Sequence, residues 1–465
     1  MRSDDPARSG DAAADPPRPP YPSAAGHPLT HTFRTMPDVL AFRDRAFAGH
    51  DVARIRLLGP GDVYNLTHPA HLERALVDDR DAFGKSGDFR LAFGAGLVAT
   101  EGETWRRQRT ALQPFFSRDR VRSYADEMAA QVERRVAEWT PGGTLDLQRE
   151  SRDLTLDVLF AALFGRELAV DGDEAIREAA GRLHDWFAPT SYPLPTWVPT
   201  PARRRFRTGR ERLRGVATDL LDEAAADPPE GPADADDLLS TLVAVREHAG
   251  EAATMTDEEI RDQLVTLIFA GHDTTASALS LAFYELARHP DVRERLHAEV
   301  DRLDGRPTAD DLDALPVTER VVNETLRLYP PVYVLPRETT RRVVVDGYRI
   351  PADAPVWLGV RQVQRDGRFF DAPEAFRPSR WDGLRESIPD FAYAPFGGGP
   401  RLCVGRGFAL AEAKVALATV CRRYRLEPAV DGSPAGDADQ IPDPPLTADM
   451  TLRLTPGTEV YVTER

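Results

Sequence analysis

The feature that most constrains this chain is a glycine-rich turn that contains a cysteine and leads into a helix. Residues 396–405 read FGGGPRLCVG, and residues 405–425 carry apolar side chains at helical spacing. Glycine adopts backbone angles that other residues avoid, so this turn can be tight. Cys403 therefore lies at or near a helix N-terminus, where free N–H groups and the helix dipole lower the pKa of a thiol. The turn predicts a thiolate that binds a soft metal, with Arg401 able to reach a carboxylate beside that metal.

The composition excludes several other classes of protein. With two cysteines, Cys403 and Cys421, the chain cannot build a disulfide framework, and their spacing fits no zinc pattern. We expect Cys421 to be a small buried apolar side chain. The formal net charge of −16 disfavours nonspecific binding to nucleic acid or anionic lipid. No apolar stretch approaches the roughly 18 residues of a membrane span, and residues 1–20 lack a signal-peptide core, so we expect a cytoplasmic protein.

The basic residues are almost all arginine, because lysine occurs only at Lys85 and Lys414. A GC-rich genome, which favours arginine, alanine, glycine and proline codons, accounts for this composition. Adaptation to high salt, in which an acidic surface holds water and ions, accounts for the acidic balance equally well. The sequence leaves both explanations open.

The chain divides into a short arm and one long domain. Residues 1–28 are rich in proline and poor in aliphatic side chains, which predicts a disordered arm. Residues 29–465 contain no repeat and no long linker, so they are expected to form a single catalytic domain.

Most of this domain is expected to be helical. A capping box at Thr256 and Glu259 begins a helix that should continue to about Arg288. At 1.5 Å per residue this helix would be roughly 48 Å long and would cross the molecule. A second helix should begin near Pro316, a good first-turn residue, and end before Pro330.

Strands are expected in two places. An Asp-Gly dipeptide, a strong hairpin signal, separates residues 341–345 from 348–350. Residues 451–454 and 460–462 should form a second pair. The predicted fold class is therefore mainly α with a small β region (α+β).

Residues 270–275, AGHDTT, place polar side chains in the middle of the long helix. Two threonines and an aspartate are poor choices there, and threonine can donate to a carbonyl one turn earlier and loosen the helix. Gly271 removes a side chain, so another group can approach the backbone. We expect His272 to be structural rather than a ligand.

Together these segments resemble the cytochrome P-450 family of haem-thiolate monooxygenases over roughly residues 30–465. The turn matches that family's F-x-x-G-x-R-x-C-x-G pattern, and residues 270–275 resemble its A/G-G-x-D/E-T motif on the helix above the haem. The resemblance implies the cytochrome P-450 fold, with haem b (iron protoporphyrin IX) between the long central helix and the cysteine loop. Cys403 would then be the axial ligand of the haem iron.

The resemblance also implies a role for each matching side chain. Asp273 would relay protons and Thr274 would organise a water beside bound dioxygen, so these two are the expected catalytic residues. Glu324 and Arg327 share a helix face, resemble the family's E-x-x-R, and would form a buried structural triad with Arg380. The expected cofactor-binding side chains, three of them on the haem propionates, are Cys403, Arg401, Phe396, Trp105, Arg109 and Arg337.

The implied activity is insertion of one oxygen atom from O2 into a small apolar substrate of the fatty acid, terpenoid, carotenoid or steroid class. The expected pocket lining is Leu97, Val98, Phe269, Ala270, Val334, Leu335 and Met450. Two electrons would come from a separate ferredoxin- or flavodoxin-type donor, because no flavin or iron–sulfur module follows the motifs. The expected docking patch is Arg106, Arg107, Arg406, Lys414, Arg422 and Arg423, with electrostatically steered association.

Two other functions remain open. A hydrogen peroxide-driven peroxygenase on the same fold would bypass the relay, so the intact Asp273 and Thr274 pair argues against it. A non-catalytic haem sensor or carrier would need no substrate pocket, and the relay argues against it too.

Two smaller features complete the expectations. The stretch from Leu183 to Arg204 contains Trp186, Phe187, Tyr192 and Trp197 and is either a substrate-entry lid or part of the core. Residues 364–367 read QRDG where many family members have histidine first and proline last, and we expect this difference to affect a surface turn and not the mechanism.

Overall fold

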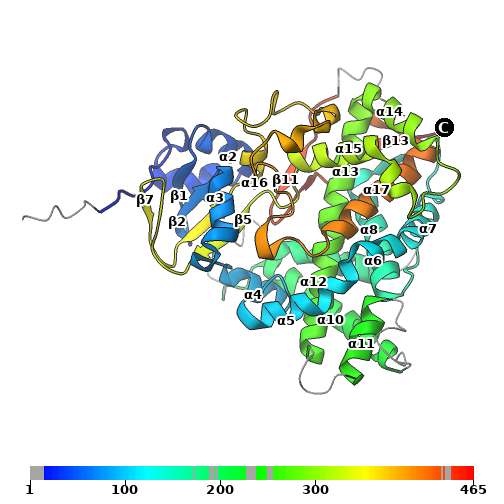
Figure 1. The fold of residues 1–465 in the computed structure, drawn as a ribbon, viewed down its shortest axis with the longest axis horizontal. Helices are drawn as coiled ribbons and strands as arrows, with labels where there is room; N and C mark the ends of the chain where they lie inside the picture. Colours follow the sequence, from blue (N-terminus) through cyan, green and yellow to red (C-terminus); the bar gives the residue numbers. More distant parts are fainter. Residues whose placement is uncertain are drawn as a thin grey trace, which may run out of the picture.

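The computed structural model of the protein describes residues 15–170, 173–187, 194, 197–226, 237–248, 255–430, 433–434 and 441–465. These residues form a large helical body on one side and a smaller region rich in strands on the other (Figure 1). The predicted fold class, mainly α with a small β region, is confirmed.

Local sequence signals set the helix ends. Helix α8, for example, begins where the Asp146 side chain accepts a hydrogen bond from the Arg149 N–H, and it ends at Gly165, whose φ is 63°. The helices are α1 (His31–Thr35), α2 (Val39–Phe47), α3 (Pro69–Glu73), α4 (Gly87–Phe93), α5 (Gly102–Leu112), α6 (Arg118–Ser123), α7 (Ala125–Val136), α8 (Leu147–Phe164), α9 (Glu174–Gly181), α10 (Pro201–Ala226), α11 (Leu238–His248), α12 (Asp257–Ile268), α13 (Thr274–Arg288), α14 (Pro290–Val300), α15 (Pro316–Leu328), α16 (Val360–Gln364) and α17 (Arg406–Arg423).

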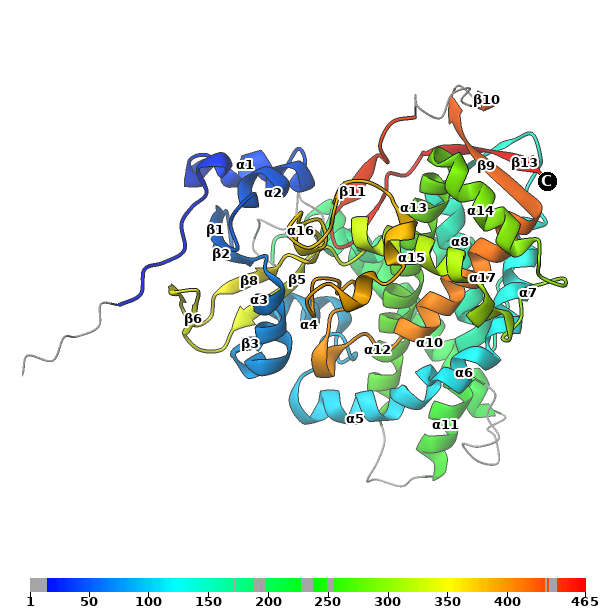
Figure 2. The same cartoon turned by 45° about the horizontal axis from the view of Figure 1, so that its top comes forward.

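The largest sheet has the strand order β1-β2-β8-β5-β3 and lies beside helices α2, α3 and α16 (Figure 2). In it β8 pairs with β5 so that Trp357 faces Pro336 and Val356 faces Arg337. The strands are β1 (Val52–Leu57), β2 (Gly61–Leu66), β3 (Phe83–Gly84), β4 (Thr144–Asp146), β5 (Leu335–Thr339), β6 (Val343–Val345), β7 (Tyr348–Ile350), β8 (Pro355–Leu358), β9 (Tyr424–Val430), β10 (Ser433–Pro434), β11 (Leu446–Ala448), β12 (Leu452–Leu454) and β13 (Glu459–Glu464).

Residues 15–28 pack against the strand region, in contrast to the disordered arm that the sequence predicts. The Arg349 N–H in β7 donates to the Pro17 carbonyl oxygen at 2.8 Å, and the Tyr21 hydroxyl donates to Asp62 at 2.6 Å. A proline-rich segment has little conformational freedom to lose, so a few such contacts suffice to order it. The first 14 residues lie outside the described part of the chain.

The predicted long helix is two α-helices joined by one wider, π-helical turn. Helix α12 begins at the predicted capping box, in which Thr256 Oγ1 accepts from the Glu259 N–H at 3.2 Å and Glu259 accepts from the Thr256 N–H at 2.8 Å. Residues 269–273 form the π-helical turn, and α13 then continues to Arg288. Such turns often mark functional sites, because the extra residue shifts the hydrogen-bond register.

The predicted pairing of residues 451–454 with 460–462 is wrong. Strand β12 pairs with β11, whereas β13 pairs with β9 and β4. Both segments are strands, as predicted, but the partner of a strand depends on long-range packing that local sequence does not encode. The other predicted hairpin is confirmed, because β6 and β7 pair antiparallel.

Candidate functional site

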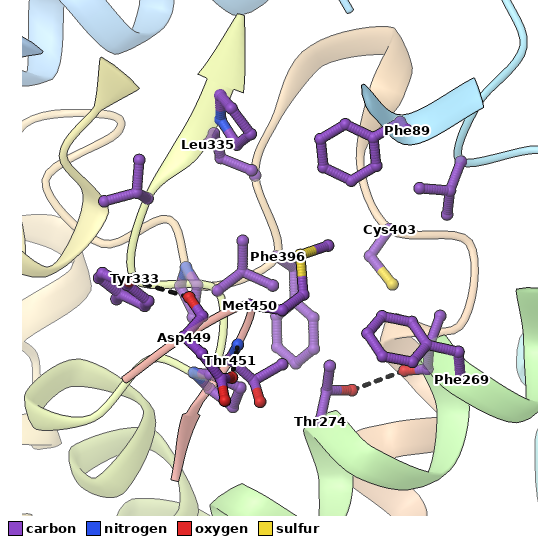
Figure 3. Close-up of a pocket in the computed structure, with 18 of the residues that line it drawn as sticks. Phe89, Phe269, Thr274, Tyr333, Leu335, Phe396, Cys403, Asp449, Met450 and Thr451 are labelled. Carbon is purple, nitrogen blue, oxygen red and sulfur yellow. Dashed lines mark hydrogen bonds between the residues drawn. The ribbon is translucent and has the colours of Figure 1, made fainter. Parts of the chain in front are cut away.

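The cysteine loop is a tight turn that precedes helix α17. Gly397 and Gly399 have φ values of 71° and 63°, and a Cβ on Gly399 would lie 2.6 Å from the Leu76 carbonyl oxygen. The Cys403 N–H donates to the Phe396 carbonyl oxygen at 3.1 Å, which closes the turn. The Cys403 sulfur consequently points into a large pocket (Figure 3).

The Cys403 thiol does not have the lowered pKa that its position predicts. Burial raises the pKa of Cys403 more than the Gly405 N–H, Arg109 and Arg406 lower it. The turn therefore supplies the predicted stabilising contacts, but the surrounding protein atoms disfavour the anion. A metal cation is the kind of partner that reverses this balance.

Four basic side chains border the pocket beside the cysteine loop. We call Lys85, Arg109, Arg337 and Arg401 the cation group; Glu101 lies 3.0 Å from Arg401. Burial and repulsion from Arg401 lower the pKa of Arg337 to about 10, and burial with repulsion from Arg401 and Arg337 lowers the pKa of Lys85 to about 7. Nη1 of Arg401 is buried without a hydrogen-bond partner among the described residues. The cation group is thus incompletely neutralised, which suits an anionic ligand.

Several contacts hold the cation group in place. Arg109 Nη1 donates to the Leu402 carbonyl oxygen at 2.7 Å, and the Arg401 guanidinium lies 5.6 Å from the centre of the Trp105 ring. Lys85 Nζ donates to the Leu97 carbonyl oxygen at 2.9 Å. The sequence predicted the three arginines but missed Lys85. Its rarity, as one of two lysines in an arginine-rich chain, was the available signal.

The predicted triad is assembled and buried. Arg327 donates twice to the Glu324 carboxylate, at 2.9 Å from both Nε and Nη2, and Arg380 Nε donates to it at 2.8 Å. The Trp381 indole N–H adds a fourth bond at 3.0 Å. Glu324 and Arg327 are fully buried, so this carboxylate depends on all of its donors.

Gln364 is buried, so the expectation that the difference at residues 364–367 lies in a surface turn is wrong for this residue, whereas Gly367 is exposed. Nε2 of Gln364 donates to the Leu326 and Arg327 carbonyl oxygens at 2.8 Å and 3.0 Å. Its Oε1 accepts from the Ala394 N–H at 2.9 Å. Gln364 therefore ties helix α15 to the segment that leads into the cysteine loop.

The π-helical turn lies across the pocket from Cys403 (Figure 3). Thr274 Oγ1 donates to the Ala270 carbonyl oxygen at 2.7 Å, and Thr275 Oγ1 donates to the Gly271 carbonyl oxygen at 2.9 Å, as the sequence predicts. A side chain on Gly271 would overlap Leu159 of helix α8, so glycine permits this close packing. His272 is buried and its Nδ1 hydrogen-bonds the Ile268 carbonyl oxygen, which agrees with a structural role.

Asp273 is held in a buried polar cluster next to the pocket. Its carboxylate lies 2.8 Å from His184 Nε2, 2.9 Å from Thr451 Oγ1 and 3.5 Å from Arg152 Nε. Burial alone would raise the pKa of Asp273, but His184 and Arg152 lower it below its usual range. Neither His184 nor Arg152 could be predicted from the sequence, because their contacts join distant segments.

His184 links Asp273 to a second carboxylate at the pocket wall. His184 Nδ1 lies 3.5 Å from Asp449, which also pairs with Arg453 at 2.6 Å. Burial lowers the pKa of His184, but the two carboxylates raise it more, so the net shift is upward. Arg152 is partly exposed, so the cluster extends from the pocket wall towards solvent.

The pocket between the π-helical turn and the cysteine loop has a volume of about 810 Å³. All seven apolar residues that the sequence predicts as its lining border it, and Phe89 adds a further aromatic wall. Of the predicted lid, Trp186 is buried, Trp197 is 79% exposed, and Tyr192 lies outside the described residues. The mainly apolar lining suits ligands with a large apolar surface.

The predicted docking patch is less basic than expected. Arg107 pairs with Glu259 at 2.5 Å, Lys414 is buried and pairs with Glu319 at 3.1 Å, and Arg423 lies 3.9 Å from an acid of β13. Arg106 and Arg406 are exposed. The sequence could not show these pairs, because each joins two separate elements.

Comparison with known proteins gives the family. Residues 47–448 match the family model described as Cytochrome P450. Pentalenene oxygenase of Streptomyces avermitilis is 33% identical over 92% of this chain and 96% of its own length. Cyclooctat-9-en-7-ol 5-monooxygenase of Streptomyces melanosporofaciens is 34% identical over 86% of this chain and 88% of its own. The chain belongs to the cytochrome P450 family and is a monooxygenase-type oxidoreductase.

The fold agrees with this assignment. The crystal structure of the cytochrome P450DA heme domain superposes with a TM-score of 0.82 at 25% identity and covers 97% of this chain and 98% of that one. The family implies a haem cofactor, and the residues present fit one, because the cysteine sulfur and the under-neutralised cation group border the same pocket. No helix in the described part of the chain is long and apolar enough to cross a membrane.

Proposed function

We propose that this protein is a cytoplasmic, haem b-dependent monooxygenase that inserts one oxygen atom from O2 into a terpenoid. The observation that carries the proposal is the apolar pocket of about 810 Å³ that has Cys403 on one wall and Thr274 on the other. Two electrons come from a separate ferredoxin- or flavodoxin-type protein. Arg106 and Arg406, two exposed members of the predicted patch, are its proposed contacts.

Two parts of the pocket would hold haem b, the Cys403 sulfur and the cation group. Cys403 binds the iron, and the cation group binds the two propionates with Trp105 beside them. Phe396 packs at the base of the loop. The buried triad of Glu324, Arg327 and Arg380 supports the loop indirectly, because Arg327 donates to the Gln364 carbonyl oxygen and Gln364 accepts from the Ala394 N–H before the loop. Bound there, the iron supplies the activation of dioxygen.

The π-helical turn delivers protons to the pocket. Thr274 holds its hydroxyl at the pocket wall by donating to Ala270, so the oxygen lone pairs can position a water. Asp273 moves protons from the buried cluster, where Arg152 reaches solvent and His184 lies within hydrogen-bond distance. A peroxide-driven enzyme has no use for this arrangement, which favours dioxygen as the oxidant.

The terpenoid assignment rests on chemistry and on relatives. The lining is aliphatic and aromatic, so it binds by excluding apolar surface from water rather than by reading polar groups. Two relatives that align over most of this chain, pentalenene oxygenase and cyclooctat-9-en-7-ol 5-monooxygenase, are named for terpenoid substrates.

The test supplies the holoenzyme with ferredoxin, its reductase and ¹⁸O2, together with sesquiterpenes, diterpenes, fatty acids and steroids. We expect terpenoid products that carry one ¹⁸O atom, and no product from Cys403→Ala. Turnover of fatty acids or steroids without terpenoids would overturn the substrate class. Faster turnover with peroxide alone than with the reductase system would overturn the monooxygenase mechanism.

A further inference from the structure

A second positively charged site borders the same pocket, away from the cation group. Arg43 of helix α2 is 1% exposed and lines the pocket where α1, α2 and β1 meet it. Its guanidinium lies between two aromatic rings, 5.2 Å from the centre of Phe47 and 5.0 Å from that of Trp357. Trp357 also borders the pocket, so this part of the wall combines an apolar surface with a buried charge.

Arg43 has polar neighbours but no carboxylate at ion-pair distance within the described residues. Its Nη2 donates to Asn65 Oδ1 at 2.8 Å and to Gln362 Oε1 at 3.3 Å. Burial, without a paired acid, lowers the pKa of Arg43 to about 10. Burying a guanidinium without a counter-charge costs free energy. An anionic ligand beside Arg43 would supply that counter-charge and offset the cost.

The groups around Arg43 are short of hydrogen-bond acceptors. Nε of Arg43, Nδ2 of Asn65 and Nε2 of Gln362 are all buried without an acceptor among the described residues. Both amide oxygens already accept from Arg43, so the free atoms are donors throughout. Gly359 lies against the same groups, and a Cβ there would be 2.7 Å from Gln362 Oε1.

The cation group provides an internal comparison. Arg337, proposed above to bind a haem carboxylate, likewise borders the pocket with a pKa lowered to about 10 and without a carboxylate at ion-pair distance in the described part of the chain. Arg337 and Trp357 belong to neighbouring registers of β5 and β8, whose successive side chains point to opposite faces of the sheet. Arg43, which lies 5.0 Å from the Trp357 ring, is therefore separate from Arg337 and the rest of the cation group.

We propose that Arg43, held in place by Asn65 and Gln362, binds a carboxylate of the substrate, so that the substrate is an acidic terpenoid held by its acid group while its hydrocarbon part extends towards Cys403. This inference rests on the proposed function and specifies the substrate class. Charge-assisted bonds to a buried guanidinium are strong, so the acid should bind roughly tenfold or more tightly than a neutral analogue.

The test measures ligand-induced haem absorbance changes in the holoenzyme with farnesoic acid, farnesol and methyl farnesoate. We expect the wild type to bind farnesoic acid at least tenfold more tightly than the other two. Asn65→Asp places a carboxylate at the position 2.8 Å from Nη2 and should abolish the preference for the acid over farnesol. Arg43→Gln should do the same, and Arg45→Gln, at an exposed position on the same helix, should keep the preference.

Four results would contradict the proposal. Equal binding of acid and alcohol by the wild type overturns the inference but leaves the proposed function intact. Retention of the preference in both Asn65→Asp and Arg43→Gln overturns it as well. Chloride could also stabilise the wild type at constant ionic strength but not Asn65→Asp. If the wild type then showed no preference for the acid, the donors around Arg43 would bind a small inorganic anion instead. Binding of none of the three ligands would overturn the inference, whereas the proposed function would still be decided separately by the turnover of sesquiterpenes and diterpenes.

Discussion

At the scale of single residues, the main feature of this pocket is a set of basic side chains that nearby acids do not fully neutralise. Lys85, Arg337 and Arg43 border it with pKa values lowered by burial to about 7, 10 and 10. Each lowered pKa means that the protein alone disfavours the charged form. The residues that we propose to bind anions therefore share one electrostatic property, a positive charge that the protein itself does not neutralise.

Replacement of Lys85 tests the cation group. Lys85→Met removes one donor to the propionates, so haem should dissociate roughly tenfold faster or more. Transfer of haem to excess apomyoglobin, followed by absorbance, measures this rate. Lys414→Met is the matched control, because Lys414 is the other lysine of the chain and pairs with Glu319 on a different surface. Equal haem loss in the two variants would contradict a propionate role for Lys85.

His184 should make the stability of the Asp273 cluster depend on pH. Because the folded pKa of His184 is raised, its stabilising contribution is complete below its ordinary value near 6.5 and is lost as pH rises through the folded pKa. The difference in unfolding free energy between wild type and His184→Asn should therefore be largest near pH 6 and should shrink at higher pH. Urea unfolding across this range measures it.

The Asp273→Asn background supplies the control for this prediction. Without the Asp273 carboxylate the pKa of His184 loses its largest upward influence, so His184→Asn should then cost less at pH 6. An unchanged cost in that background would show that His184 acts through packing alone.

At the scale of secondary-structure elements, the site is formed by the π-helical turn between α12 and α13 and by the cysteine loop. The break between α12 and α13 follows the polar residues 270–275, and the sequence predicted the loosening because threonine can donate to its own helix. It could not predict that the helix widens into a π turn, because this depends on packing against α8. The loop's turn was predictable from its glycines.

Gly271 should be intolerant of a side chain. Gly271→Ala places a methyl group into Leu159, which should destabilise the protein by about 1–3 kcal/mol. Leu159→Ala should relieve part of that cost in the double variant, and thermal unfolding of all four proteins gives the coupling. Additive effects of the two substitutions would contradict a direct contact between them.

The triad should be required for the folded loop. Glu324→Gln leaves two arginines facing a neutral group in a fully buried site and should cost about 3–5 kcal/mol. Urea unfolding and the haem content of purified protein measure the two consequences. Glu319→Gln on the same helix, where the carboxylate is exposed, should cost less than about 1 kcal/mol.

Much of the fold and the site could be predicted from the sequence, and the errors share one cause. Helix ends, the hairpin at Gly347, the triad and the seven lining residues follow from local patterns or from matched motifs. The partner of β12, the burial of Gln364 and the ion pairs of the docking patch depend on contacts between distant segments. His184 was missed for the same reason, because nothing near it in sequence marks it as a partner of Asp273.

At the scale of the whole molecule, the net charge of −16 is spread over a chain with 75 acidic and 59 basic residues. Many arginines pair with acids across elements, as at Arg122 with Asp313 and Arg368 with Asp51. The excess acidic charge therefore remains as a general repulsion that compaction increases.

Salt should stabilise the protein by screening this repulsion. The melting temperature should rise between about 10 mM and 300 mM NaCl, where the screening length falls from roughly 30 Å to below 10 Å, and should level off above that. Differential scanning calorimetry measures the change. A rise that continues into molar salt would favour adaptation to high salt over codon usage as the origin of the composition.

The scarcity of lysine turns one side chain into a chemical reporter. Lys414 is buried and ion-paired, whereas Lys85 borders the pocket with a pKa of about 7, so a large fraction of its amine is unprotonated and nucleophilic near neutral pH. An acylating reagent small enough to enter the pocket should therefore modify one ε-amine per chain. Haem propionates are proposed to bind at that amine and would shield it. The fraction of chains that escapes acylation should therefore measure how much of the protein carries haem.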